Sequence, residues 1–162
     1  ALLERAVSIN EAAFGPQHLE VAHSIIDLSH ACGELGDRHM QKELLIRALR
    51  ILEANYGLDD VHLASTLTYL SNACGARGET EEQKDLLLRV LGMKEVAFGR
   101  DHAETAMTVF DLARCFWKSG ERGTALTLMI RVESVFVSSL GFGHPCTRAA
   151  QECHSDWLSA PY

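Results

Sequence analysis

The sequence predicts an all-α fold built from repeated antiparallel helical hairpins. Two observations indicate this fold: a 42-residue repeat that needs no gap along the 162 residues, and an apolar pattern of helical period inside each repeat. Only three prolines occur, which also favours helices over a turn-rich sheet. One hairpin cannot bury its apolar face alone, so we expect about eight helices stacked as a solenoid.

Glycines mark the repeat most clearly, because they recur at two positions of it. They stand at Gly15, Gly57, Gly99 and Gly141, and again at Gly36, Gly78 and Gly120. Glycine ends helices readily, since it adopts positive φ at little cost. We therefore predict a single repeat array over residues 1–162. It is divided into a trailing helix (1–14), three repeats (15–56, 57–98 and 99–140) and a C-terminal capping helix (141–162).

The first three helices are expected over residues 1–13, 18–34 and 38–55. The first is the second helix of a partial repeat, because its apolar residues align with those found 42 positions later. The other two carry apolar residues at the spacing of one helix face. These residues are Val21, Ala22, Ile25, Leu28 and Cys32 in one helix, and Leu44, Leu45, Ala48, Ile51 and Leu52 in the other.

The next four helices repeat this pattern over residues 60–76, 80–97, 102–118 and 122–140. Asp59 and Asp101 are the predicted N-caps of the first helix in their repeats, and Asp101 with Glu104 fits a capping box. Each repeat is then a helix A, a tight turn, a helix B and a short linker.

The last helix is expected over residues 144–159. Gln151, His154 and Ser155 occupy positions where the other repeats carry apolar residues, and a terminal repeat needs a polar outer face. We interpret it as a capping helix whose Trp157 and Leu158 cover the last hairpin. The alternative is an exposed edge that pairs end to end with a second copy, giving a homodimer.

Composition argues against several classes of partner. The net charge is −7, and no block of Lys and Arg suits a nucleic-acid backbone. No run reaches the roughly 18 apolar residues of a membrane span. The N-terminal residues do not resemble a signal peptide, so we expect a cytoplasmic protein that binds neither nucleic acid nor membrane.

Cysteines and histidines do not form a ligand pattern. The five cysteines include no CxxC pair, and Cys32 and Cys74 lie one repeat apart, as small buried hydrophobes would. His23 and His30 are two helical turns apart, roughly 10 Å, too far for one ion. The linker residues His18, His102 and His144 are expected to dock the linker on a neighbouring hairpin.

Catalytic motifs are also missing. The sequence contains no G-x-x-x-x-G-K-S/T loop, no GxGxxG and no GxSxG elbow. Acidic pairs such as Glu81 and Glu82 stand at the start of a helix, where their negative charges interact favourably with the positive end of the helix dipole. We therefore predict no catalytic residue, no cofactor and no metal site, and expect the chain not to be an enzyme.

Two stretches give the repeat a family resemblance. Residues 45–51 read Leu-Ile-Arg-Ala-Leu-Arg-Ile and match the first part of the repeat signature L-x-R-A-L-x-I-x-E-x-x-x-G-P-x-H-P-x-V-A-x-S-L-x-x-L-A. Residues 15–18 and 21–24 match its second part. The chain resembles the tetratricopeptide repeat in its 42-residue, kinesin-light-chain-like form. The resemblance implies a right-handed superhelix with the A helices on the concave side and the B helices on the convex side.

The chain departs from that form at three places. Helix B has Gln41 and Gln83 where a small residue is expected, and only Ala125 fits. Cys32 and Cys74 replace a late aromatic residue of helix A. The paired asparagines of the ligand-binding face are replaced by Ile26-Asp27, Thr68-Tyr69 and Phe110-Asp111.

The resemblance also implies which residues line the groove. They are His23, Ile26, Asp27, His30, Thr68, Tyr69, Asn72, Phe110, Asp111, Arg114, Trp117 and Lys118. Aromatic residues and Arg are common interface anchors. We predict a peptide with apolar side chains near Tyr69, Phe110 and Trp117 and an acidic group near Arg114 or Lys118. Alternatively, Phe110 and Trp117 only pack between helices.

Two functions follow from this prediction. The first is a scaffold or adaptor module that binds a peptide or partner helix. The second is a structural spacer or self-association segment of a larger protein. A carboxylate clamp of the kind that holds a chaperone tail is disfavoured, because Asp27 and Asp111 would repel the ligand's carboxylates.

Overall fold

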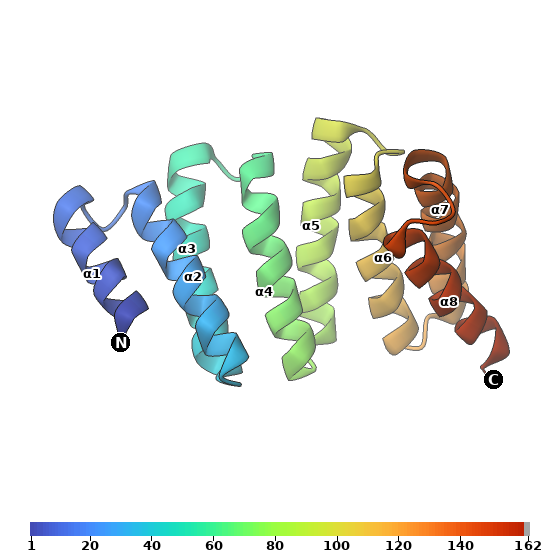
Figure 1. Ribbon diagram of the computed structural model, residues 1–162, viewed down its shortest axis with the longest axis horizontal. Helices are drawn as coiled ribbons and strands as arrows, with labels where there is room; N and C mark the ends of the chain where they lie inside the picture. Colours follow the sequence, from blue (N-terminus) through green and yellow to red (C-terminus); the bar gives the residue numbers. More distant parts are fainter. Residues whose placement is uncertain (161–162) are drawn as a thin grey trace. The chain divides into compact units, whose positions relative to one another are not determined.

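The computed structural model describes residues 1–160, which form eight α-helices, one 3-10 helix and no strand within that range (Figure 1). The helices are α1 (Leu2–Phe14), α2 (Leu19–Glu34), α3 (Arg38–Tyr56), η1 (Val61–Leu63), α4 (Ala64–Arg77), α5 (Thr80–Phe98), α6 (Ala103–Lys118), α7 (Arg122–Leu140) and α8 (Pro145–Ser159). The predicted all-α hairpin-repeat fold is confirmed. Seven helices begin and end within one residue of the prediction, while η1 forms the first turn expected of the remaining helix.

The chain forms two compact units, Ala1–Leu86 and the residues from Leu87 onward, with the boundary inside α5. In unit 1, α1 packs against α2, α2 against α3, and α3 against α4. Apolar residues at helical spacing explain this packing, since one stripe of each helix is buried. The stripes include Val21 and Ile25 on α2, Leu45 and Leu52 on α3, and Leu67 on α4.

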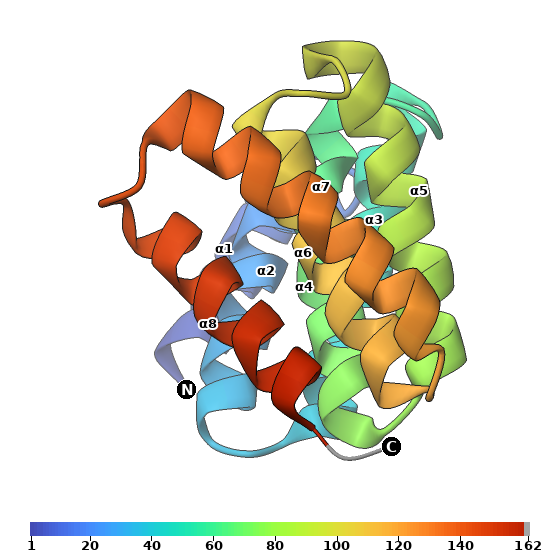
Figure 2. The same ribbon diagram turned by 90° about the vertical axis from the view of Figure 1, so that its right-hand side faces the viewer.

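In unit 2, α6 packs against α7 and α7 against α8 (Figure 2). Its main core joins Val109 of α6, Met129 and Phe136 of α7, and Ala150 and Trp157 of α8. Trp157 therefore covers the last hairpin as predicted, whereas its neighbour Leu158 is exposed.

The turn between helix A and helix B is the same in all three hairpins. The residue after the turn glycine donates its backbone N–H to a carbonyl five residues earlier, as in Asp37 N to Cys32 O at 2.9 Å. The glycine itself has positive φ, +85° at Gly36, and this conformation suits residues without a Cβ. The repeated turn glycine is therefore required by backbone geometry.

Histidines cap three of the A helices. The Nδ1 atoms of His18, His102 and His144 each accept the backbone N–H two residues on, at 3.2 Å. The predicted caps Asp59 and Asp101 were wrong by one position, because the side chains that reach the free N–H groups belong to the next residues, Asp60 and His102. The predicted capping box at Asp101 is not formed.

Two of the capping histidines, His18 and His102, also stack on the aromatic residue that ends the preceding helix B, whereas the helix before His144 ends in Leu140. The ring centroids are 4.9 Å apart for Phe14 and His18, and 5.2 Å apart for Phe98 and His102. In the second repeat the two roles are divided: Asp60 caps the helix, and His62 stacks on Tyr56 at 4.8 Å. These three ring contacts fix each linker against the end of the preceding helix B.

The glutamines that replaced a small residue in helix B are accommodated by glycines in helix A. A Cβ on Gly33 would lie 2.5 Å from Nε2 of Gln41, and one on Gly75 would lie 2.5 Å from Oε1 of Gln83. In the third hairpin the sizes are reversed, with Trp117 at the glycine position and the buried Ala125 at the glutamine position. Large and small residues thus exchange sides while the hairpin geometry is kept.

Helix α7 meets the length and composition of a membrane span, and it is the one helix of the described residues that does. Five of its residues, among them Val132 and Phe136, are buried in the core of unit 2. A core helix of a water-soluble fold has the same composition, so this helix gives only weak support for a membrane role. The expectation of no membrane partner stays a prediction.

Candidate functional site

The predicted binding residues of unit 1 lie on α2 and α4. Of these, His23, Asp27, Tyr69 and Asn72 are exposed, while Ile26, His30 and Thr68 are half-buried. The two helices meet at His30 and Tyr69, whose ring centroids lie 4.4 Å apart with the rings at 85°. This edge-to-face contact joins the predicted residues of α2 and α4 into one face.

Not every predicted residue of this face offers a free polar group. The hydroxyl of Thr68 donates to the carbonyl of Ala64 at 2.8 Å, within its own helix. Asp27 and Asn72 have exposed polar ends. Tyr69 keeps 38% of its surface exposed, which makes it the largest exposed apolar group among these predicted residues. The face therefore combines one aromatic ring with an exposed carboxylate and an exposed amide.

The predicted residues of unit 2 lie along α6. Phe110 is half-buried and packs against the core, so only part of its ring is accessible. The guanidinium of Arg114 lies 5.9 Å from the centre of that ring and 4.0 Å from the carboxylate of Asp111. Burial raises the pKa of Asp111, an effect that the nearby cations Arg114 and Lys94 oppose. Arg114 is exposed and remains accessible to a ligand carboxylate.

Trp117 lies at the end of α6 and stacks on Trp157 of α8. The two indoles are nearly parallel, with 3° between their planes and 4.7 Å between their centres. The guanidinium of Arg122 lies 5.0 Å from the Trp117 ring centre, at cation–π distance. This geometry favours the packing alternative for Trp117, while Lys118 next to it is exposed.

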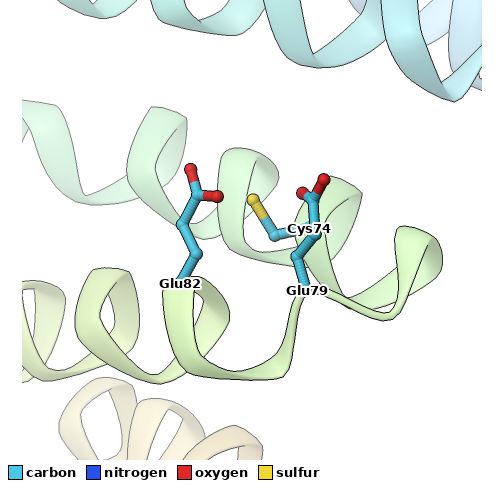
Figure 3. Close-up of side chains that lie close together, drawn as sticks. All are labelled: Cys74, Glu79 and Glu82. Atoms are coloured by element: carbon cyan, nitrogen blue, oxygen red, sulfur yellow. The ribbon is translucent and has the colours of Figure 1, made fainter.

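A polar cluster that the sequence analysis missed joins α3 to the turn between α4 and α5. Lys42 Nζ lies 2.8 Å from Glu79 Oε2 and 2.6 Å from Glu82 Oε2. Cys74 lies beside the two carboxylates, and the three side chains point the same way (Figure 3). Lys42 and Glu79 are 37 residues apart, so no local spacing indicated this contact.

The charges in the cluster stabilise one another. Hydrogen bonds from Lys42 and Arg77 lower the pKa of Glu79 to about 2. Burial lowers the pKa of the Lys42 ammonium, but its hydrogen bonds to Glu79 and Glu82 outweigh burial and hold that pKa above the usual range. Burial raises the pKa of the Cys74 thiol to about 11, so this thiol stays protonated and unreactive at neutral pH.

Cys74, Glu79 and Glu82 form a donor set that could hold a metal ion, since their ligand atoms lie within 4.8 Å of one another. The Lys42 ammonium, however, already supplies a positive charge to both carboxylates. A metal ion would have to displace this ammonium and deprotonate the thiol. The arrangement therefore fits a structural ion pair better than a metal centre.

Comparison with known families identifies one repeat directly. Residues 63–104 match the tetratricopeptide repeat family model, and these residues run from the start of the second A helix to the start of the third. No curated protein matches the sequence significantly. The family match thus covers one 42-residue unit and agrees with the resemblance stated from the sequence.

Solved structures extend the likeness to the whole chain. A Podosopora anserina protein described as a putative kinesin light chain with nearly identical TPR-like repeats has a TM-score of 0.84 in its Q17M form and 0.82 in a second structure. Both are 22% identical over 97% of this chain and 74% of theirs. BtubC (BKLC) from P. vanneervenii has a TM-score of 0.66 and 16% identity, over 100% of this chain and 77% of its own. The chain therefore has the kinesin-light-chain-like tetratricopeptide fold.

Proposed function

We propose, from the tetratricopeptide-type fold, that this chain is a protein-interaction module whose A helices bind a peptide or a partner helix. Such folds generally bind proteins rather than catalyse reactions, and the proposed role includes no catalysis. The specific observation that supports it is the face formed by α2 and α4. There, His30 and Tyr69 are in ring contact, and Tyr69 remains 38% exposed.

The ligand we propose follows from the exposed groups. Tyr69 in unit 1 would contact an apolar side chain, because aromatic residues anchor interfaces at low entropic cost. Arg114 and Lys118 in unit 2 would pair with an acidic group of a ligand, since both are exposed. Phe110 contributes the accessible part of its ring.

A displayed peptide library panned against the purified chain would test this proposal. Peptides that bind unit 1 are expected to lose affinity for Tyr69→Ala, and peptides that bind unit 2 are expected to lose affinity for Arg114→Glu. Matched controls on B helices are Leu88→Ala, whose side chain is 49% exposed, and Arg50→Glu, also at an exposed arginine. If the A-helix variants bind as tightly as the two controls, the A helices are not the binding surface and the proposal is wrong.

One observation favours the second candidate function, self-association. Leu2 and Leu35 are 85% and 86% exposed and lie with Leu3, Leu28 and Cys32 around an open apolar depression between α1 and α2. Exposed apolar surface of this kind marks interaction sites. Light scattering would show a concentration-dependent dimer that Leu35→Lys abolishes, whereas a monomer at all concentrations would exclude this candidate.

A further inference from the structure

The exposed face of α2 carries an unusual row of side chains. Glu20, His23, Asp27, His30 and Glu34 follow one another at intervals of three and four residues, so they share one side of the helix. The three carboxylates are seven residues apart, which places successive ones about 10.5 Å apart along the helix axis. We call these five residues, together with Tyr69 of α4, the α2 face.

The carboxylates of the α2 face have no ion pair among the described residues. Helix α2 contains no Lys or Arg. Elsewhere in unit 1 carboxylates do find cations: Glu11 pairs with Arg47, and Glu79 and Glu82 pair with Lys42. The α2 face therefore keeps three carboxylates without an ion-pair partner among the described residues.

The fold does not require this charge. The corresponding positions of η1 and α4 are His62, Ser65, Tyr69, Asn72 and Ala76, and those of α6 are Glu104, Met107, Asp111, Arg114 and Lys118. Neither row carries three carboxylates, although both helices occupy the same place in their repeats. The acidic row is thus particular to α2, and core packing does not explain it.

Tyr69 adds an aromatic group next to this row. Its ring meets the ring of His30 edge to face, which holds it beside the middle of α2. An exposed aromatic face attracts Lys and Arg through its quadrupole. A Lys or Arg side chain offers both an apolar stem for contact with Tyr69, as the proposed function requires, and a cationic end for the carboxylates.

We infer that the α2 face binds a partner helix carrying Lys or Arg at intervals of seven residues. The negative charge of the α2 face requires a positively charged partner. The basic residues of a partner helix would be seven residues apart, because seven residues of any α-helix span about 10.5 Å. The inference rests on the proposed function and adds the chemistry of the partner for unit 1. Each basic residue would lie against one of the three carboxylates.

The experiment uses three labelled helical peptides of alanine and glutamine and measures binding by fluorescence anisotropy at low salt. The first has three lysines spaced seven residues apart, and the second has the same three lysines spaced five residues apart. The third has glutamates in place of the lysines of the first. We expect the seven-spaced lysine peptide to bind most tightly, and its binding to weaken with added salt.

Two triple variants of the chain remove the same charge from different places. Glu20→Gln/Asp27→Asn/Glu34→Gln removes the carboxylates of the α2 face and is expected to weaken binding about tenfold, as for three exposed ion pairs. Asp59→Asn/Asp85→Asn/Glu152→Gln removes three exposed carboxylates outside α2 and should change binding by less than about twofold. Circular dichroism would verify that both variants remain folded.

Two results would overturn the inference: equal weakening by both triple variants, or equal binding of the two lysine peptides. Either would mean that net charge alone attracts the peptide. If only the glutamate peptide binds, and Arg114→Glu abolishes that binding, the inference about α2 fails while the proposed function stands. If no peptide binds at all, the inference about α2 fails, while the proposed function is decided separately by the peptide library.

Discussion

The contact between Gly75 and Gln83 gives a sharp stability prediction for Gly75→Ala. A Cβ at this position would lie 2.5 Å from Gln83 Oε1 and 2.6 Å from its Nε2, so the buried glutamine amide must move. Alanine in place of glycine stabilises a helix by up to about 1 kcal/mol. Forcing extra volume into a packed site costs about 1–3 kcal/mol. The expected net effect is a loss of about 0–2 kcal/mol.

Gly92→Ala is the matched control, because Gly92 lies inside α5 and a Cβ there would meet nothing within 4 Å. It should stabilise the chain by about 1 kcal/mol, or roughly 2–4 °C in Tm. In a Gln83→Ala background the obstruction is gone, so Gly75→Ala should then stabilise by the same amount. Urea unfolding of the wild type, Gly75→Ala, Gln83→Ala and the double variant measures the coupling energy between the two substitutions. This energy is expected to be about 1–3 kcal/mol. A coupling below about 0.5 kcal/mol would refute the packing argument.

Three further predictions follow from contacts described above. Removing the helix cap with His102→Ala should cost about 1 kcal/mol in urea unfolding, whereas His102→Asn, which also caps, should cost much less. The pKa of Glu79 is lowered to about 2, so its stabilising effect is complete above its ordinary pKa and is lost as the pH falls from about 4.5 toward 2; the urea midpoint of the wild type should therefore fall more steeply in acid than that of Glu79→Gln. Trp157→Ala should cost about 3–5 kcal/mol and shift the emission of Trp117, the one tryptophan left, to longer wavelength; an unchanged spectrum would contradict the stacked arrangement.

The helices could be predicted from the sequence because their determinants are local. Apolar periodicity and the recurrent glycines fix where each helix begins and ends, and both depend on neighbours a few residues away. The start of the second A helix differed, since Val61–Leu63 form a 3-10 turn, a tighter geometry that is frequent at the first turn of an α-helix. The cap of α6 was misplaced by one residue because histidine is not among the usual capping residues, whereas in the second repeat the adjacent Asp59 and Asp60 are both suitable caps by residue type.

The contacts between distant residues could not be predicted in the same way. Lys42 meets Glu79 and Glu82 only because two hairpins stack, and no short-range pattern encodes that meeting. The stacking of Trp117 on Trp157 likewise depends on the placement of α8. The candidate binding residues were carried over from a family resemblance, and their role as a binding surface stays a prediction. Sequence periodicity locates their helix face, whereas ligand affinity depends on desolvation and complementarity with a partner.

In the second repeat, Asp60 makes the cap and His62 makes the ring contact that a single histidine makes in the first and third repeats. This affects how repeats of this kind are compared. Aligned by position, the second repeat has lost the linker histidine, because an aspartate stands in its column. In the structure both contacts are kept, because the Asp60 carboxylate caps the helix and the His62 imidazole stacks on Tyr56. What persists between repeats is an interaction that different residues can supply. A profile that scores each column separately will undervalue such repeats, and comparing interactions rather than letters should find more of them.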